Sequence, residues 1–358
     1  MACLGHQVDL FSRSLQPSEL DVVKKLRWHA REVFRGVERC EITGGLFSIK
    51  TPTFHLFFGK GKWVARRVEK VSAFFLEREK YDGILTEAYG GFWMPKKRGV
   101  PQVYDLVDDH AAGFRHGGEP RTAEEVDRYL RHAVRVCDQL TVSSRVLADF
   151  SLKKFGRQAQ VIPNGADVKR IRSVANQERR PGPIRIGYVG GLDSFVRIEF
   201  LIEVVSAVRA RGADVEVVIV GHGPAIQNIK LPTWVKYLGF RKPDEIPLIL
   251  ADFDIGVVPF EISPYTDAAL PLKVIEYGAA RKPTLSSPLE ELKRHQLPWV
   301  RLEPLRLDRW KNALEEMIQT FHSVGKTSNS AWDGAWDAVV DRYDWLEAAA
   351  EMLRVIKK

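Results

Sequence analysis

The chain has 358 residues, 45% of them hydrophobic, which is enough to bury two cores of ordinary size. Its cysteines are few, odd in number and without metal-site spacing; together with the lack of a recognisable signal peptide they predict a reducing cytosol. No apolar run approaches the ~20 residues of a membrane-spanning helix, so we expect a soluble or peripheral protein.

The net charge of the chain is +8, and two segments together hold an excess of basic over acidic residues of the same size. Residues 24–39 hold six Lys/Arg against two Glu, and residues 60–80 hold seven against three, a surplus of four in each. Both have the periodicity of amphipathic helices. They are either solvated helix faces packed on a core or a surface that docks on anionic lipid. Nucleic acid is the weaker interpretation because no recognition motif accompanies the charge.

Strand and helix patterns alternate along the first half of the chain. This alternation predicts a parallel sheet covered by helices on both faces. The expected strands are QVDLFS, DGILTE, PQVYDLV, QLTVSS and AQVIP, and the expected helices are 17–36, 60–79, 122–137 and 144–155. The polar, proline-bearing segment NQERRPGP, residues 176–183, predicts a linker.

The first residues, MACLGHQVDLFSR, indicate the end of a helix, a glycine stop and a strand. A doubly wound domain normally begins with a strand and a helix before that point, within a βαβ unit of about 30 residues. We therefore expect a first domain that lacks its first strand and helix. Either the true start lies upstream, which we favour, or the sheet lacks that strand and its glycine-rich turn.

A second series of strands and helices follows the linker. IRIGYVGG and VEVVIVGHGP each predict a strand that ends in a glycine turn, and VKYLG, DIGVVPF, TLSS and WVRL predict further strands. The sequence thus predicts an α/β protein with two tandem doubly wound, Rossmann-like domains, residues 1–176 and 177–330, followed by a C-terminal helix in 331–358.

The stretch PLKVIEYGAARKP, residues 271–283, predicts a short helix with Pro271 at its first position. Lys273 and Glu276 lie three residues apart and share one face of that helix. A surface ion pair at this spacing contributes only ~0.2–0.5 kcal/mol. A charge-assisted hydrogen bond to a ligand contributes ~1.5–3 kcal/mol, and we favour a ligand-binding role for the pair.

The order of VIPNGADVKR, VVIVGHGP, KYLGFRKPDEIPLILADFDIGVVPF and TDAALPLKVIEYGAARKPTLSS resembles the retaining GT-B glycosyltransferases of family four. The resemblance covers nearly the whole chain, is strongest from about residue 138 to 287, and points to a branch with YDxxDDH, here YDLVDDH at 104–110. It implies two domains facing a cleft, with a nucleotide-sugar in the second and the acceptor in the first. It also implies that the C-terminal helix crosses back to the first domain.

The resemblance assigns a catalytic role to the pair in the second domain. Lys273 matches a residue that faces the donor diphosphate at a helix N-terminus, where an ammonium and the helix dipole stabilise the negative charge of the leaving group. Glu276 matches the second glutamate of the E-x7-E motif, which accepts hydrogen bonds from the nucleotide ribose.

The sequence departs from the family at three places. The first glutamate of E-x7-E falls on Ala268, with Asp267 one place earlier as a substitute contact to the donor sugar. The Arg and Lys that grip the diphosphate in relatives fall on Gly191 and Val196; Arg197, next to the second, is either a substitute or solvated. A protein that binds the donor but does not catalyse transfer is therefore an alternative to an active glycosyltransferase.

Glycine turns carry the remaining candidates in the second domain. Gly190 and Gly191 close one strand and let the backbone approach a phosphate, although tight turns explain many such pairs. Gly221 and His222 form a second turn, in which His222 is more often a turn residue than a ligand. Two further residues, Phe240 and Arg241, lie where relatives hold the nucleotide base.

Carboxylates follow an expected strand in the first domain. Asp105, Asp108, Asp109 and His110 lie where doubly wound folds place ligands, and by resemblance they contact the transferred sugar or the acceptor. Asp108 is the strongest candidate for a polar catalytic contact, and Glu87 is a second candidate for the cleft. A helix cap or a loop of solvated carboxylates is the competing explanation.

No metal or other cofactor is expected. The DFD at 252–254 mimics a metal-binding DxD but precedes a buried strand, and the histidines lack ligand spacing. By resemblance, GT-B enzymes generally need no metal.

The sequence therefore predicts a retaining glycosyltransferase of the hexosyltransferase type, active in polysaccharide biosynthesis. Its expected partners are a nucleotide-diphosphate-sugar donor and a glycan, lipid-linked or small-molecule acceptor, with no nucleic acid. The expected location is the cytoplasm, with residues 24–39 and 60–80 as candidate contacts to the inner face of the membrane. A GT-B-fold nucleotide-sugar epimerase and a non-catalytic nucleotide-sugar-binding subunit of a glycan-assembly complex are the alternatives.

Overall fold

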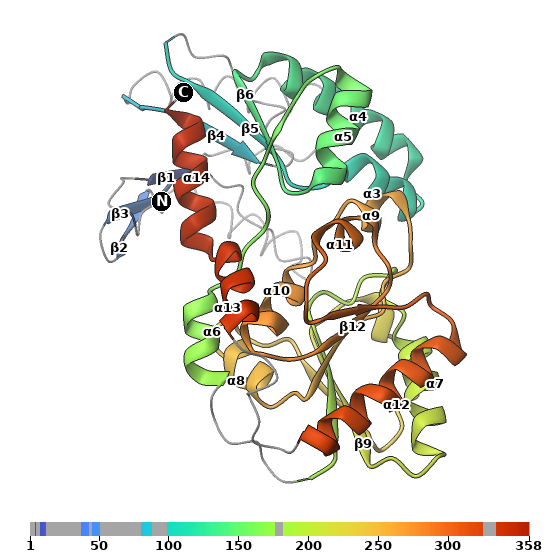
Figure 1. Cartoon of the computed structure of the whole chain (residues 1–358). Coiled ribbons are helices and arrows are strands. Elements are labelled where there is room, and N and C mark those ends of the chain that lie inside the picture. The colour runs from blue at the N-terminus through green and yellow to red at the C-terminus, as the bar shows by residue number, and fades with distance from the viewer. Residues whose placement is uncertain are drawn as a thin grey trace, which may run out of the picture.

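The computed structural model describes residues 80–87, 99–175, 182–324 and 334–357, together with residue 4 and the backbone of 8–11, 37–42 and 45–50 (Figure 1). These residues form two α/β domains, each built on a parallel sheet, which confirms the predicted fold class. The helices expected at 17–36 and 60–79 and most of the expected linker lie outside the described residues.

The first domain contains a four-stranded parallel sheet in the order β4-β5-β6-β7. Helix α4 starts with Pro120 and buries an apolar stripe that includes Val126, Leu130 and Val134, as its sequence periodicity predicts. The elements are β4 (Ile84–Glu87), β5 (Gln102–Leu106), α3 (His110–His116), α4 (Pro120–Val136), β6 (Gln139–Val142), α5 (Arg145–Phe155) and β7 (Gln160–Val161).

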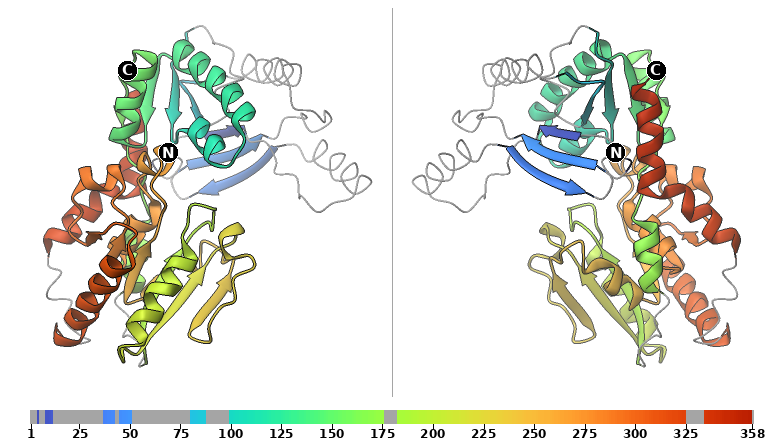
Figure 2. Two further views of the ribbon diagram at one scale, coloured as in Figure 1. Left: turned by 90° about the vertical axis from the view of Figure 1, so that its right-hand side faces the viewer. Right: turned by 90° about the vertical axis from the view of Figure 1, so that its left-hand side faces the viewer.

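A separate three-stranded sheet, in the order β1-β3-β2, lies beside the first domain (Figure 2). β1 (Val8–Phe11) pairs with β3 (Gly45–Lys50) in parallel, and β2 (Val37–Ile42) pairs with β3 in antiparallel fashion. The sequence predicted β1 but not the antiparallel pair.

The second domain contains a six-stranded parallel sheet in the order β10-β9-β8-β11-β12-β13. The chain winds outward from β8 in one direction and from β11 in the other, so the topological switch point lies between these two strands. The strands are β8 (Ile184–Val189), β9 (Val215–Val220), β10 (Val235–Gly239), β11 (Ile255–Val258), β12 (Thr284–Ser286) and β13 (Val300–Leu302). The helical elements are α6 (Val168–Ala175), α7 (Ile198–Arg209), η4 (Pro224–Ile226), α8 (Ile246–Ala251), α9 (Pro264–Asp267), α10 (Leu272–Ala279), α11 (Glu290–His295) and α12 (Leu307–Val324).

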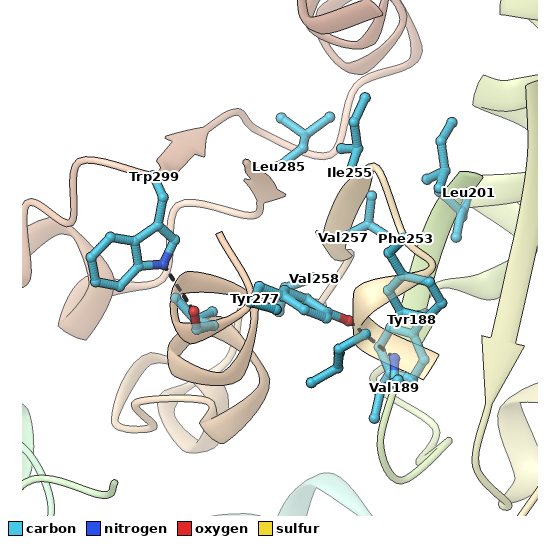
Figure 3. Close-up of a cluster of buried hydrophobic side chains, with 14 of the residues drawn as sticks. Tyr188, Val189, Leu201, Phe253, Ile255, Val257, Val258, Tyr277, Leu285 and Trp299 are labelled. Atoms are coloured by element: carbon cyan, nitrogen blue, oxygen red, sulfur yellow. Dashed lines mark hydrogen bonds between the residues drawn. The ribbon is translucent and has the colours of Figure 1, made fainter. Parts of the chain in front are cut away.

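Buried aromatic residues fix α10 against the centre of this sheet (Figure 3). The Tyr277 hydroxyl accepts a hydrogen bond from the Val189 N–H at 3.0 Å, and the Trp299 indole N–H donates to the Val274 carbonyl at 2.9 Å. Tyr277 and Trp299 are almost completely buried. Tyr277 therefore holds α10 against the end of β8, where the chain turns.

The chain crosses between the domains twice, and the two crossings are hydrogen-bonded to each other. The Ala166 N–H donates to the Tyr343 carbonyl at 2.8 Å, and the Trp345 N–H donates to the Ala166 carbonyl at 3.1 Å. A Cβ on Gly165 would lie 2.6 Å from the Tyr343 carbonyl oxygen, so this crossing requires glycine. The returning elements are α13 (Gly334–Val340), η6 (Asp341–Tyr343) and α14 (Trp345–Ile356).

The helix that follows each crossing joins the domain that the chain has reached: α6 joins the second domain, and α14 joins the first. α6 buries Val168 and Ile171 in the second domain's core, although the predicted boundary at 176–177 assigns this helix to the first domain. α14 lies along the first domain and packs Val355 and Ile356 against Val103 (Figure 1). In the described part of the chain, no helix combines the length and hydropathy needed to cross a bilayer.

Candidate functional site

Two glycine turns and one lysine meet at the switch point of the second domain. Gly190, at the end of β8, and Gly221, at the end of β9, have φ of 138° and 139°. A Cβ on Gly221 would lie 1.8 Å from the Gly190 carbonyl oxygen, and a Cβ on Gly190 would lie 2.8 Å from Lys273 Cε. Only glycine permits this close approach of the two strand ends and the lysine.

The Lys273 ammonium rests on aromatic rings rather than on carboxylates. Its Nζ lies 4.6 Å from the ring centroid of Phe260 and 5.4 Å from that of Tyr188. Among the described residues it forms no hydrogen bond and no ion pair. Burial lowers the pKa of Lys273 from 10.5 to about 8, while the charges of Glu276 and Asp193 act in the opposite direction. The ammonium is therefore held next to the glycine turns with its donors unused.

Glu276 lies one turn further along α10. Burial raises the pKa of this carboxyl, and the nearby Lys273 charge lowers it in part. Its side chain accepts no hydrogen bond from the described residues. Pro271 is the N-cap of α10 rather than its first helical residue. The helix thus presents one cation and one anion with free hydrogen-bonding capacity on the same face.

The other predicted donor contacts in the second domain either bind neighbouring residues of the chain or are exposed to solvent. The Gly191 carbonyl accepts the Tyr188 hydroxyl at 2.6 Å, and the His222 carbonyl accepts the Leu192 N–H, while the His222 side chain is exposed. Arg197 pairs with Glu261 at 2.9 Å, so its charge is already compensated. Among the candidates for the nucleotide base, Phe240 is 72% exposed, and Arg241 lies 3.8 Å from Glu245.

Asp267 and Ala268, the expected contacts to the donor sugar, lie at the contact between the domains. Ala268 is buried and belongs to the hydrophobic core of the first domain, with Ala111 and Leu147. Asp267 Oδ1 accepts the N–H of Glu290 at 3.0 Å at the start of α11. One of these positions is therefore an apolar packing residue, and the other has one oxygen engaged by the backbone.

In the first domain, Glu87 and Asp105 lie side by side on β4 and β5. Asp105 Oδ1 accepts a hydrogen bond from the Thr141 hydroxyl at 2.7 Å. Burial raises the pKa of Asp105 to about 6, the Thr141 hydrogen bond lowers it, and the charge of Glu87 raises it further. Thr141 was not predicted from the sequence, because a threonine in a strand carries no chemical signal by itself.

Asp108 lies in the loop that leads into α3. Burial raises the pKa of Asp108 to about 6, and the neighbouring Asp109 charge adds to the effect. Asp109 caps α3 by accepting a hydrogen bond from the Ala112 N–H at 3.0 Å. From the sequence, a helix cap was the competing explanation for these carboxylates. His110 is the first residue of α3, and burial lowers its pKa. The Asp108 carboxylate, unlike that of Asp109, accepts no hydrogen bond from the described residues.

An aromatic cluster joins the candidate residues of the second domain to those of the first. The Phe195 ring centroid lies 5.0 Å from Phe260, 5.8 Å from Tyr265 and 6.3 Å from His116 of α3. Tyr265 lies directly under Gly113, where a Cβ would be 3.1 Å from the ring. The loop after β8 and helix α3 therefore form one surface between the domains. The sequence did not predict this cluster, since aromatic residues in loops are not distinguishable from core residues.

A second contact between the domains depends on the fully buried Glu291 of α11. Its two oxygens accept the N–H groups of Arg145 and Val146, both at 2.9 Å, at the start of α5. Its Oε1 also lies 2.8 Å from His295 Nε2, and His295 Nδ1 lies 2.6 Å from the Tyr343 hydroxyl. Burial alone would raise the pKa of Glu291, but hydrogen bonds from His295 and the two N–H groups lower it on balance. This carboxylate joins three segments of the chain.

The DFD segment has a structural role. Asp252 Oδ1 lies 2.6 Å from Arg185 Nη1, and Asp254 Oδ2 accepts the Arg185 N–H at 2.8 Å. Among the described residues, no group of three or more His, Cys, Asp or Glu side chains is arranged to hold a metal ion.

Residues 183–320 match the family model of Glycosyl transferases group 1. A segment of 72 residues is 38% identical to the putative teichuronic acid biosynthesis glycosyltransferase TuaH of Bacillus subtilis (strain 168). The aligned segment covers 20% of this chain and 18% of TuaH. The chain thus spans less than a fifth of that relative.

Solved structures share the fold over most of the chain. Sucrose-phosphate synthase from Thermosynechococcus elongatus aligns with a TM-score of 0.67 at 16% identity, covering 97% of this chain and 87% of the other. A UDP-forming trehalose-phosphate synthase from Burkholderia xenovorans aligns at 0.63 and 15% identity, covering 90% of each chain. HepE from Anabaena, in complex with UDP and glucose, aligns at 0.60 and 19% identity, covering 87% and 86%. The chain therefore has the GT-B fold, and its second domain matches the group 1 glycosyltransferase family model.

Proposed function

We propose that the protein transfers a sugar from a nucleotide-diphosphate-sugar donor to an acceptor with retention of anomeric configuration. The observation that carries this proposal is the Lys273 ammonium beside Gly190 at the switch point of the second domain, which forms no hydrogen bond or ion pair with the described residues. Doubly wound domains bind ligands at this place, and an anionic diphosphate would supply the partner that the lysine lacks.

The residues of the site have distinct roles in this reaction. The acceptor hydroxyl oxygen bonds to the anomeric carbon, the bond from that carbon to the diphosphate breaks, and the leaving phosphate oxygen takes the hydroxyl proton. Lys273 stabilises the charge that grows on the diphosphate, and Glu276 accepts hydrogen bonds from the ribose. Asp108, with a pKa of about 6, is mostly ionised at neutral pH and contacts the sugar or the acceptor.

One observation favours a second candidate function. Ala268 is buried in the first domain's core, and Arg197 is paired with Glu261, so two of the family's donor contacts are absent or occupied in the described residues. These features favour a subunit that binds a nucleotide-sugar without transferring it.

Donor binding is the first test. We expect one nucleotide class in a panel of UDP-, GDP-, dTDP- and ADP-sugars to raise the melting temperature, because a ligand at about 100 times its Kd stabilises by about 2.7 kcal/mol. UDP-sugars are the first choice, since HepE was solved with UDP and glucose. A flat response to the whole panel would contradict the proposal.

Product analysis then separates the candidates. A transferase releases nucleotide diphosphate faster when acceptor is present, and the TuaH match makes polysaccharide precursors the first acceptors to try. Conversion of the sugar with donor alone would identify an epimerase instead. Donor binding with no turnover under any acceptor would identify the non-catalytic subunit.

We also propose that the basic segments 24–39 and 60–80, most of which lies outside the described residues, bring the protein to an anionic membrane surface. Flotation with vesicles of phosphatidylcholine and phosphatidylglycerol should show binding that weakens as salt rises. Equal flotation with neutral vesicles would count against this role.

A further inference from the structure

A basic pocket lies between the C-terminal halves of α4 and α5. Both helices belong to the first domain (Figure 1). The volume of the pocket is about 530 Å³, within the range of ligand pockets. It lies apart from the candidate donor site, because helices that follow parallel strands end near the opposite edge of the sheet. Among the described residues the pocket is lined by Arg128, Arg131, His132, Val134, Arg135, Lys154, Phe155, Gly156 and Arg157, and none of these is acidic.

The positive charge of this pocket is only partly compensated. Asp127 pairs with Arg131 at 3.1 Å and also with Lys154. Arg128 and Arg135 form no ion pair with a carboxylate among the described residues, and Arg135 lies 3.4 Å from a ring nitrogen of His132. Of the five Lys and Arg side chains that line the pocket, two are thus paired with a carboxylate of the described residues, and both share Asp127.

The fold accounts for only part of this concentration of charge. Arg128, Arg131 and Arg135 follow one another at helical spacing on a single face of α4, and like charges at that spacing destabilise a helix. The helix dipole favours cations only in the last turn, which includes Arg135 but not Arg128 or Arg131. A structural role explains Arg157, which caps α4 by donating to the carbonyls of Val134, Cys137 and Asp138.

Aromatic and backbone contacts hold three of the five cations in place, namely Lys154, Arg131 and Arg157. Lys154 Nζ lies 4.7 Å from the Phe150 ring centroid and 5.6 Å from that of Phe155, and the Arg131 guanidinium carbon lies 5.7 Å from Phe155. These contacts restrict the side chains before any ligand arrives, which lowers the entropy cost of binding.

We propose that this pocket is a second binding site, for a ligand that carries phosphate groups. Guanidinium groups match phosphate oxygens with paired hydrogen bonds, and several fixed cations suit a multiply charged anion better than a single carboxylate. The phosphate belongs either to a soluble molecule or to a lipid headgroup. This site is independent of the donor site proposed above.

Charge reversal on α4 tests the proposal in the full-length protein. Inorganic pyrophosphate is titrated by calorimetry, and vesicles with and without phosphatidylglycerol are tested by flotation. The variant is Arg128→Glu with Arg135→Glu, and the control with the same change in net charge is Lys169→Glu with Lys230→Glu, two exposed lysines in the second domain. We expect the variant to weaken binding about tenfold or more, and the control to match the wild type. Circular dichroism confirms that both variants are folded.

Each outcome decides one point. Loss of pyrophosphate binding assigns a soluble phosphate ligand, and loss of flotation alone assigns a lipid headgroup. Pyrophosphate also binds at the candidate donor site if the proposed function is correct, so Lys273→Ala is titrated in parallel and should remove a different set of sites. The pocket proposal is overturned if the α4 variant matches the wild type in both assays, whatever Lys273→Ala does.

Discussion

Replacement of Lys273 by alanine is expected to abolish sugar transfer while the protein stays folded. The ammonium makes no hydrogen bond or ion pair with the described residues, so its removal costs the fold little. It would remove the cation closest to the leaving diphosphate, which should reduce turnover by about a hundredfold or more. Steady-state kinetics with the identified donor measure the loss, and the melting temperature reports the fold.

Two variants control this result. Lys273→Met keeps the packing on Phe260 and Tyr188 but removes the charge, so it should be as inactive as Lys273→Ala. Asp108→Asn should keep donor affinity and lose turnover, because Asp108 belongs to the other domain. An active methionine variant would reject the electrostatic role of Lys273.

The pH dependence of donor binding gives an independent check. Lys273 has a pKa of about 8 in the free protein, and an anionic ligand binds its charged form more tightly. Donor affinity should therefore fall as pH rises through about 8, and Lys273→Met should not show this fall. A wild-type affinity that stays constant between pH 7 and 9 would exclude the lysine as the phosphate contact.

Replacement of Glu291 by alanine is expected to loosen the contact between the domains. The change leaves the N–H groups of Arg145 and Val146 without acceptors in a partly buried place, at a cost of up to about 1–3 kcal/mol for each group. We expect a lower melting temperature and faster hydrogen exchange at the start of α5. Glu291→Gln keeps an acceptor oxygen and should lose less.

This stabilisation depends on pH with a definite sign. The folded protein holds the pKa of Glu291 below its usual value, so the carboxylate stabilises the fold above the unfolded pKa of about 4.3. The contribution is lost as pH falls through the folded pKa. The difference in stability between the wild type and Glu291→Ala should thus be large at pH 7 and shrink below about pH 4. A difference that stays constant would show that the alanine acts only by creating a cavity.

The elements of the second domain could be predicted because their signals are local. IRIGYVGG and VEVVIVGHGP are apolar runs that end in glycines, and both form strands whose last residues lie at the switch point. α6 shows the limit of this approach. Its apolar face predicts a helix, but nothing in its sequence says which of the two cores it joins.

The residues between the domains were the hardest to predict. Glu291 and His295 lie in ELKRH, a charged helix typical of a solvated surface, and only the approach of α5 makes them buried partners. In the sequence, Ala268 was the absence of the first glutamate of E-x7-E, whereas in the structure its methyl group packs in the first domain's core. Such roles depend on contacts between residues far apart in the sequence.

The hydrogen-bonded crossing at Ala166 and Asp344 limits how the two halves of the molecule can move. Both covalent connections pass through one place, and Gly165 packs there against the Tyr343 carbonyl. At this place the two domains can rotate relative to each other more easily than they can slide, because sliding would break both hydrogen bonds between the crossings. Points far from this pivot move furthest, so a small twist of the backbone at the crossing would change the separation of the domains most at their distant ends.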